Sequence, residues 1–474
     1  MARTARTPRR HARPDPWLWT APWLWTLASL AFGLAPCGAV HADEPAVSSS
    51  RAAGNPGDTS GKPPVEHLFG DWGGLRTALD AAGLDLTVKY TGETAAVVSG
   101  GERTGIDYAG QIEIKAVADM GRLAGLNGLS LHLDTVNRHG RNASADFLGD
   151  HIFQVQEIYG GGGDVGIHLV SFYAQQKFLK DKIDLEGGRI PVGADFANSP
   201  LNCDFMTDAI CGSPHSLPAK EAFTIFPNST WGGRLKVEPA AGLYVEAGVY
   251  QVRPLFGGRS GFDWSSSGTT GAYFPLEIGY EPQIGAAKLI GHYKLGATYD
   301  TSTYPDLYFD AAGDPIAFSG LPGRGRQGRG SVYLLADQML ARTGKGSTDG
   351  IIVLGGYVHS SPRTSRLEDL AYAGVLATGV VPGRPKDAIG LLVIGVKVSG
   401  ALERTQELAV TQGLPLMNMA DGVQTHETVI EANYDIHVVD GFHLMPDFQY
   451  VVRPGATQRF PNAAVIGLKI GLSL

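Results

Sequence analysis

From residue 84 to the end of the chain, apolar and polar side chains alternate with a period of two. The alternation is cleanest in 426–438, where apolar residues such as Ile430 and Ile436 alternate with charged residues such as Glu431. A period of two places alternate side chains on opposite faces of an extended strand. The pattern therefore predicts an all-β chain whose strands have one apolar and one charged face. It recurs in 84–93, 106–119, 129–138 and 286–300.

Strands of this kind fit either a soluble sandwich or a transmembrane barrel, and the connections between them favour the barrel. Outside residues 1–42, no apolar run approaches the roughly 18 residues that a membrane-spanning helix needs. Short turns on one rim and long loops on the other are typical of a transmembrane β-barrel. Short connections, such as 180–182 and 438–441, here alternate with long Gly-rich loops expected at 139–166, 192–228, 254–272, 301–328 and 361–386.

Fifteen segments carry the strand pattern, and the last of them, 462–474, is apolar at every second position up to the final residue. A barrel whose termini lie on the same side has an even number of strands. We assign the remaining strand to 401–411, although ALERTQELAVT has a more helical pattern. The sequence thus predicts a transmembrane antiparallel β-barrel of sixteen strands over residues 84–474, wide enough to enclose an aqueous lumen.

The first 83 residues divide into three segments. Residues 1–42 combine five arginines, an apolar Trp-rich run and a small-residue cleavage site, which is the pattern of an export signal. Residues 43–66 are rich in Ser, Gly, Pro and Ala and predict a flexible linker. In 67–83, Leu75 and Leu79 have helical spacing before Gly83, so we expect one short amphipathic helix there.

Removal of the export signal takes away five of 39 basic and one of 47 acidic residues and leaves a net charge of about −12. An acidic chain without a Lys/Arg block offers little to DNA or RNA, so nucleic acid is not an expected partner. Cys37 leaves with the signal, and Cys203 and Cys211 remain as an even pair in an oxidising compartment. The pair is a disulfide candidate, with two unpaired thiols as the alternative.

Three segments resemble the carbohydrate-selective porins of the OprB family. HLFGDWGGLRTALDAAGLDLTVKYTGETAAVVSGG (67–101) resembles the family's opening, with a GDWGG-L-R segment, a short helix and a first strand ending in a Gly pair. ETVIEANYDIHVVDGFHLMPDFQYVVRPG (427–455) is similar to its late strands, and GGRIPVGADFANSP (187–200) matches as well. Leu474 and Arg453 depart from the pattern, since outer-membrane barrels usually end in an aromatic residue and the family more often has a neutral residue before Pro-Gly.

The resemblance implies a sixteen-stranded porin in the outer membrane of a Gram-negative bacterium, through which mono- and small oligosaccharides diffuse passively. The partners it implies are outer-membrane lipid, lipopolysaccharide and the barrel-assembly machinery, and a monomer is favoured. A general or anion-preferring diffusion porin is the alternative. A barrel enzyme is a third class, but no triad or metal-ligand spacing is evident, so we expect neither a catalytic residue, nor a metal, nor a cofactor.

A channel for neutral sugars needs hydrogen-bonding groups and apolar surfaces at its constriction. The longest loop, 192–228, is the expected constriction loop, and a disulfide would stiffen it. Its candidate residues are Asp195, Phe196, Asn198, Phe205, Phe223 and Phe226. For each aromatic, packing against the barrel wall is the alternative role, and for each wall charge, a transverse ion pair. The pore-lining candidates, inward by parity except for Arg189 at a strand end, are Glu93, Glu113, Lys115, Asp134, Arg189, Arg234, Lys236, Glu431 and Gln449.

Overall fold

The computed structural model describes residues 67–149, 151–158, 165–217, 222–254, 260–416, 420 and 422–474. The expected export signal (1–42) and linker (43–66) lie outside the described residues. Seventeen strands occur in the described part of the chain, and one of them, β9, is only two residues long. The strands are β1 (Leu84–Ser99), β2 (Gly105–Asp119), β3 (Leu129–Gly140), β4 (Val165–Phe178), β5 (Ile183–Ile190), β6 (Thr230–Ala240), β7 (Leu243–Val252), β8 (Gly271–Tyr280), β9 (Gln283–Ile284), β10 (Leu289–Asp310), β11 (Gly323–Arg342), β12 (Gly350–Ser360), β13 (Leu367–Thr378), β14 (Ala388–Val398), β15 (His426–Val439), β16 (Phe442–Val452) and β17 (Ala463–Ser473).

Helical segments in the described residues lie outside the strands and are mostly short. No helix in this part of the chain has both the length and the apolar character needed to cross a membrane. The helices are η1 (Trp72–Gly74), α1 (Leu75–Ala82), α2 (Met120–Ala124), the π-helix η2 (Ser144–Leu148), α3 (Val192–Asp195), η3 (Pro200–Asp204), α4 (Ile316–Ser319), α5 (Gly400–Thr411) and η5 (Pro454–Ala456).

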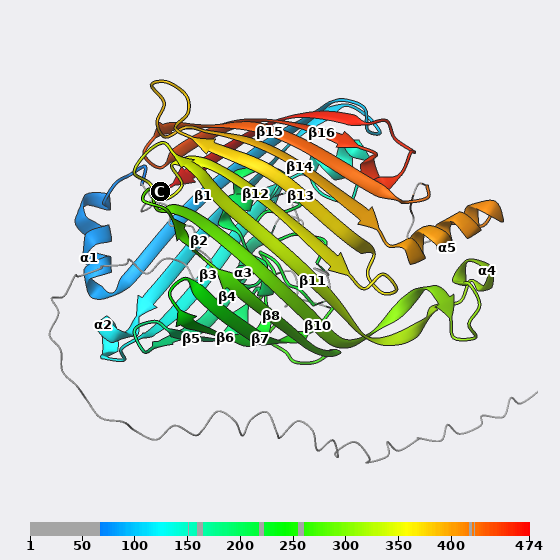
Figure 1. The fold of residues 1–474 in the computed structure, drawn as a ribbon, viewed down its shortest axis with the longest axis horizontal. Coiled ribbons are helices and arrows are strands. Elements are labelled where there is room, and N and C mark those ends of the chain that lie inside the picture. The colour runs from blue at the N-terminus through cyan, green and yellow to red at the C-terminus, as the bar shows by residue number, and fades with distance from the viewer. Residues whose placement is uncertain are drawn as a thin grey trace, which may run out of the picture. The chain divides into compact units, whose positions relative to one another are not determined.

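The strands form one closed antiparallel sheet. Each long strand pairs with the next along the chain, and β1 pairs with β17 to close the ring, with Glu93 opposite Lys469. The short β9 pairs only with the start of β10 and is not part of the ring. The described residues therefore form a barrel of sixteen strands (Figure 1), which confirms the predicted fold class.

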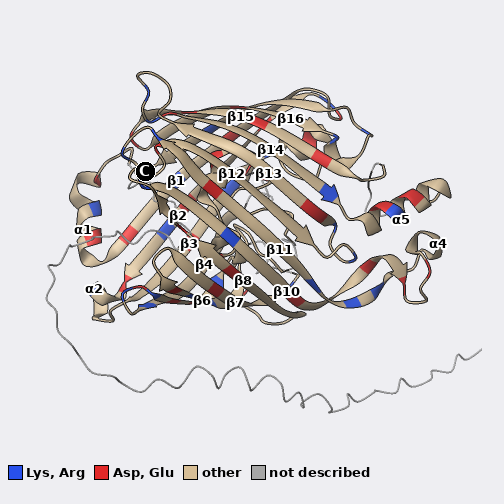
Figure 2. Ribbon diagram, in the orientation of Figure 1, with Lys and Arg blue, Asp and Glu red and all other residues tan. Residues whose placement is uncertain are grey.

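The predicted alternation has a structural counterpart on the two faces of the sheet. Apolar side chains on the outer face are exposed, as at Ile430 in β15 and Leu295 in β10. The charged side chains between them, such as Glu431 and Lys294, point inward and are buried. Figure 2 shows acidic and basic residues spread along the strands as well as the connections. An apolar outer belt around a polar interior is what a barrel in lipid requires.

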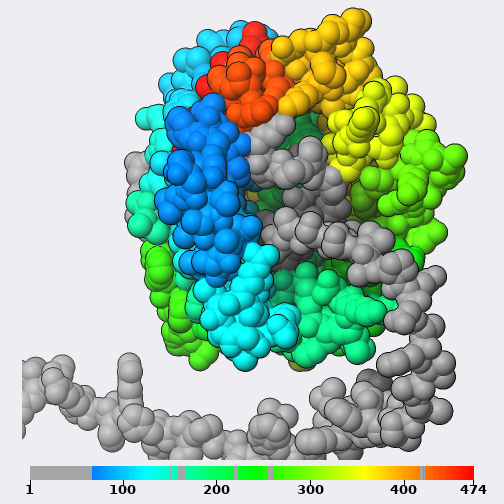
Figure 3. Space-filling view, turned by 90° about the vertical axis from the view of Figure 1, so that its left-hand side faces the viewer, coloured from blue at the N-terminus to red at the C-terminus, as the bar shows by residue number. Residues whose placement is uncertain are grey.

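The two rims differ in the length of their connections, as predicted. The C-terminal residue and tight turns, such as Asp440–Gly441 between β15 and β16, lie on one rim, which also carries α1 and α2. Figure 3 views this rim, where segments far apart in sequence surround a recessed region. The opposite rim carries the longer connections, including α4 and α5 (Figure 1).

Three assignments from the sequence were wrong. The segment 401–411 is not a strand: Ser399 caps helix α5, its Oγ accepting from the main-chain N–H of Ala401 (3.2 Å), and Leu402, Thr405, Gln406 and Ala409 are buried at helical spacing. The sixteenth strand is β13, inside the expected loop 361–386. The strand was missed because both of its faces are apolar: Leu370 and Tyr372 point inward, and Ala371 and Ala373 point outward.

The expected loop 301–328 is also mostly strand. β10 continues to Asp310 and β11 begins at Gly323, so the two strands project together beyond their neighbours and only 311–322 connect them. Asp306 holds the projection together through ion pairs with Arg326 (2.5 Å) and Arg324 (3.5 Å). The polar residues of this segment gave it the composition of a loop, although a projecting hairpin needs no apolar face.

The expected N-terminal helix is present as α1, and it is fastened to the end of the barrel. Gly83 ends the helix in the left-handed conformation (φ 92°), which glycine adopts without strain. Arg76 donates to the main-chain oxygens of Leu474 (2.6 Å) and Leu86 (3.0 Å), and its guanidinium lies over the ring of Trp72 (4.1 Å). The arginine of the GDWGGLR segment thus links the first strand to the C-terminal residue, and the tryptophan packs against that arginine.

Candidate functional site: the barrel interior

The 192–228 segment folds into the barrel. Its main chain contacts inward side chains from widely separated strands, since Ala197 donates to Glu277 of β8 (2.9 Å) and Met206 donates to Glu431 of β15 (2.5 Å). Lys294 of β10 also donates to the main-chain oxygen of Asn198 (2.8 Å). The loop therefore lies inside the barrel, between β8 and β10 on one side and β15 on the other.

The middle of this loop is a closed ring. Cys203 and Cys211 form a disulfide, and Ser199 donates its main-chain N–H to Gly212 O (2.7 Å). His215, just beyond the ring, lies 3.2 Å from Asp208 within it. Covalent and hydrogen-bonded closure limits the conformations open to this part of the loop.

The loop phenylalanines attach it to the barrel wall. Phe196, Phe205 and Phe223 are fully buried, and Phe196 and Phe223 make edge contacts with the inward rings of Tyr250 and Tyr273, both at 6.2 Å. Phe226 is partly exposed and lies under the guanidinium of Arg138 (5.2 Å). Packing accounts for the first three rings, whereas Phe226 and the partly exposed Asn198 remain candidates for contact with a solute.

A second segment, 151–158, also folds inward, and the sequence reasoning did not identify it. Ile158 donates its main-chain N–H to Glu93 (3.0 Å), and Val155 O accepts from Gln449 Nε2 (2.9 Å). The main-chain N–H of Asp208 donates to Gln154 O (3.0 Å), which joins this segment to the first loop. Its apolar residues Ile152, Phe153, Val155 and Ile158, unusual in a polar loop, were the available signal.

Arg234 is the centre of a buried ion-pair cluster on β5–β7. Its guanidinium lies 2.7 Å from Glu186 and 3.1 Å from Asp195, the loop residue of α3. Asp184 (3.4 Å) and Glu246 (4.0 Å) complete the cluster. Burial raises the pKa of Asp195 above its ordinary value, against the opposing effect of Arg234. The cluster links the constriction loop to the wall and keeps Arg234 away from solvent.

Most of the predicted wall residues face inward but are covered by loops. Glu93, Arg189, Arg234, Glu431 and Gln449 are all buried. The Arg189 guanidinium, for example, donates to the main-chain oxygens of Ser229 (2.9 Å) and Asp263 (3.2 Å), both in long connections. These side chains hold the infolded segments in place and have little surface left for a solute.

A smaller set of predicted wall residues is open to the interior. Lys115 lies 2.9 Å from Glu113 and 3.8 Å from Asp134; the side chains of Lys115 and Glu113 are 23% and 12% exposed, whereas Asp134 is buried. Lys236 is also partly exposed and covers the ring of Tyr244 at 3.8 Å. Neighbouring opposite charges that are partly exposed can donate to and accept from the hydroxyl groups of a sugar.

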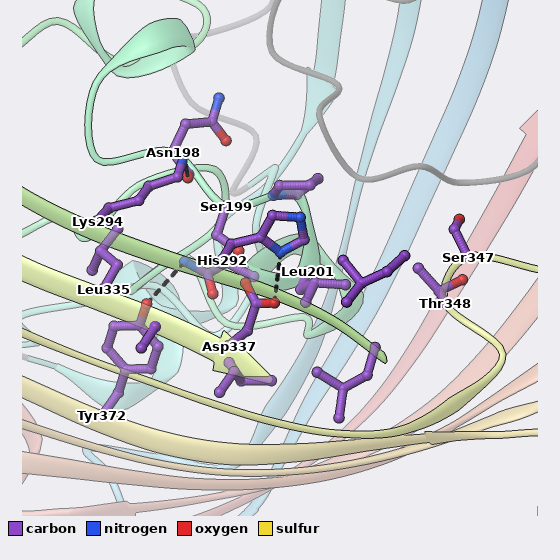
Figure 4. Close-up of a pocket in the computed structure, with 16 residues that line it drawn as sticks. Asn198, Ser199, Leu201, His292, Lys294, Leu335, Asp337, Ser347, Thr348 and Tyr372 are labelled. Carbon is purple, nitrogen blue, oxygen red and sulfur yellow. Dashed lines mark hydrogen bonds and ion pairs between the residues drawn. The ribbon is translucent and has the colours of Figure 1, made fainter. Parts of the chain in front are cut away.

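Opposite this set, the inner wall is apolar. The inward side chains of β11–β14 include Leu335, Ile352, Leu354 and Tyr372, all buried, and Leu201 of the constriction loop packs against them. Beside this contact lies a depression (Figure 4). Its volume is about 580 Å³, including the part that is open to solvent. Its polar groups include His292, which lies 2.7 Å from Asp337. The lumen thus has one charged side and one apolar side closed by the loop.

Two groups in the described residues bring three potential metal ligands together, and neither is a free ligand set. Glu157 lies beside Cys203 and Cys211, but these two sulfurs are bonded to each other. His359, Glu368 and Asp369 lie together near Lys397, which is 3.5 Å from Glu368 and 3.9 Å from Asp369. Hydrogen bonds and ion pairs account for the second group.

Comparison with known proteins places this architecture among porins. Residues 103–474 match the family model described as carbohydrate-selective porin, OprB family. Porin B of Pseudomonas aeruginosa is 30% identical over 427 residues, covering 86% of this chain and 91% of that protein. A putative porin of Acinetobacter baylyi, QuiX, is 24% identical over 423 residues, with 86% and 92% covered. The high-pH structure of Pseudomonas putida OprB superposes with a TM-score of 0.80 at 29% identity, covering 86% of this chain and 99% of that one.

Proposed function

The chain belongs to the OprB family of carbohydrate-selective porins, and from this premise we propose how its interior admits small sugars across the outer membrane. Passage is by diffusion through the barrel, with no chemical step. The observation that carries the proposal is the pair of infolded segments, 151–158 and the constriction loop, which narrow a lumen that sixteen strands would leave wide. A narrowed passage brings a solute into contact with its walls, and selectivity requires that contact.

The sugar-contacting groups in this proposal are the partly exposed ones. Glu113 and Lys115 offer an acceptor and donors on one wall, with the buried Asp134 beside Lys115, and Asn198 and Phe226 offer an amide and a ring from the constriction loop. Carboxylates accept from sugar hydroxyls and the ammonium group donates to them, which compensates a sugar for part of its lost hydration. Binding must still allow release, so we expect millimolar affinity, about 4 kcal/mol.

The test compares permeation of sugars and amino acids of equal mass in liposomes that contain the purified protein. Faster swelling with sugars is expected. Equal rates would favour a general porin, and faster entry of anions would favour an anion-preferring one. In planar bilayers, added sugar should block the ion current with a half-blocking concentration in the millimolar range. Lys115→Met should raise that concentration while leaving the barrel folded.

The remaining assignments are proposals about processing and surroundings. Residues 1–42 act as an export signal and 43–66 as a linker, while α1 lies on the periplasmic side with the short turns. The barrel is a monomer in outer-membrane lipid, contacts lipopolysaccharide and is inserted by the barrel-assembly machinery. The exposed Ile466 and Leu468 on the outer face of β17 support the contact with lipid. Mass measurement of the protein in native lipid particles tests the monomer.

A further inference from the structure

We propose that Glu277 and Glu431 are positioning residues that set the width of the passage by holding the two ends of a crossbar, residues 197–207. The inference rests on the proposed function, because it explains how that passage is narrowed. Neither residue needs to touch the sugar. Each acts through the main-chain N–H groups of the constriction loop, and the crossbar spans the interior between them.

At the first end, Glu277 of β8 is 0% exposed and its two oxygens have different partners. Oε2 accepts the main-chain N–H of Ala197 (2.9 Å) and the hydroxyl of Tyr333 (2.7 Å), while Oε1 accepts the hydroxyl of Tyr244 (2.6 Å). Ala197 has a φ of 53°, a left-handed conformation that turns the chain away from the wall. The two wall tyrosines therefore fix the orientation of the carboxylate independently of its bond to the loop.

Glycines make this orientation possible. The ring of Tyr333 lies against Gly296, where a Cβ would come within 2.0 Å of the ring, and the ring of Tyr244 lies against Gly279, where a Cβ would come within 2.1 Å. Any larger residue would displace the tyrosines. Both hydroxyl groups can reach Glu277 only because these wall positions have no side chain.

At the second end, Glu431 of β15 is 1% exposed and accepts two consecutive main-chain N–H groups. Met206 donates to Oε1 (2.5 Å) and Thr207 donates to Oε2 (3.1 Å). Asn433, two residues along the same strand face, donates to the main-chain oxygen of Asp204 (2.9 Å). Strand β15 thus binds this end of the crossbar in two ways: Glu431 accepts two of its main-chain N–H groups, and Asn433 donates to one of its main-chain oxygens.

The position of the two carboxylates makes the crossbar a dividing element. Five barrel strands, β10–β14, separate β8 from β15 along the shorter arc of the ring. The crossbar closes this arc, and Leu201 packs on its apolar inner face, while Asn202 donates to the hydroxyl of Tyr372 (3.4 Å). The space that remains for solutes lies between the crossbar and the charged side of the lumen. A shift of the crossbar therefore changes the cross-section of the passage directly.

A carboxylate suits this task better than a neutral group. Main-chain N–H groups of a loop that crosses the interior have no strand partner, and leaving them unpaired when buried is costly. A carboxylate accepts on both oxygens, and bonds to its charged form are stronger than neutral ones. Glutamine has nearly the same shape but replaces one acceptor by an amide donor, so Glu→Gln separates the bond from the packing.

The experiment measures single-channel conductance and sugar block of E277Q and E431Q in planar bilayers, with folding checked by the heat-dependent mobility of the barrel in gels. In channels that fold, we expect conductance to rise by roughly 1.5-fold or more, and the half-blocking sugar concentration to rise by roughly threefold or more. E431D, which keeps two acceptors, should restore part of the block. Wild-type conductance and block in both glutamine variants would overturn the proposal.

Two further variants complete the test. D300N is the matched control, because Asp300 is a fully buried inward carboxylate of β10 that accepts from Ser302 of its own strand (2.8 Å), and it should conduct as wild type. M206P removes one N–H from the loop side and leaves the wall intact, so it replaces E431Q if that variant does not fold. Absence of sugar block in the wild type would refute the proposed function, whereas unchanged ion conductance in the variants would refute only the crossbar.

Discussion

Arginine placed at successive outward positions of β15 should destabilise the barrel in proportion to depth in the membrane. Ala432 lies at the middle of the 14-residue strand, and its outward neighbours Leu391 and Phe448 are 55% and 45% exposed. Val438 is exposed near the strand's end, at the register irregularity between His437 and Val439. Six residues span about 20 Å along a strand, or about 14 Å of depth at a tilt of roughly 45°. This distance is slightly more than half of an apolar band about 25 Å tall.

The magnitude follows from these depths. Arginine at the midplane of a barrel costs about 2–4 kcal/mol, and near the interface about 0–1 kcal/mol. Ala432→Arg should therefore lower the free energy of unfolding by about 2 kcal/mol more than Val438→Arg, roughly a 30-fold difference in the folding equilibrium. Urea titration in thin lipid bilayers, followed by tryptophan fluorescence, measures both. Equal losses at the two positions, or a larger loss at Val438, would refute the assignment of this face to lipid.

Three further predictions concern other parts of the chain. An epitope inserted in 311–322, rather than in the segment that forms β13, should be labelled on intact cells; labelling only after permeabilisation would reverse the orientation. Arg76→Ala should lower the free energy of unfolding by about 2 kcal/mol because charged donors to two main-chain oxygens are lost, and Arg76→Lys should lose less. Burial would raise the pKa of Asp387, but hydrogen bonds from Arg384 (2.8 Å) and Tyr434 (2.6 Å) hold it below 3.8. The stabilisation that the ionised Asp387 gives to the fold is therefore fully present above pH 3.8 and is lost as the pH falls through the lowered pKa. Asp387→Asn should accordingly make the free energy of unfolding less dependent on pH in acid.

Alternation could be read from the sequence wherever one face of a strand meets lipid and the other meets charge. β15 is such a strand, with Ile430 outside and Glu431 inside. β13 is not, because its inward residues Leu370 and Tyr372 belong to the apolar cluster that includes the constriction loop, and its outward residues Ala371 and Ala373 are apolar too. A strand that is apolar on both faces has no polarity period, so its place in the barrel was visible only from its pairing with β12 and β14.

The direction of each wall side chain could be predicted, but not what stands opposite it. Parity predicted that Glu93 and Gln449 point inward; their side chains are buried against the main chain of Ile158 and Val155, 65 and 294 residues away. Such partners belong to loops without a period of their own. Exposure at these positions depends on where the loops fold, which only the tertiary structure determines.

The inward carboxylates therefore have two different roles, which depend on the groups that each one contacts. Where a loop's main-chain N–H groups arrive, as at Glu277 and Glu431, the carboxylate is buried and its oxygens accept from protein donors. Where no loop arrives, as at Glu113 beside Lys115, the side chains stay partly exposed. A solute can compete only for the second kind of group. In the channel proposed here, the fixed carboxylates hold the segments that narrow the passage, and the open pairs are the groups that a solute can reach.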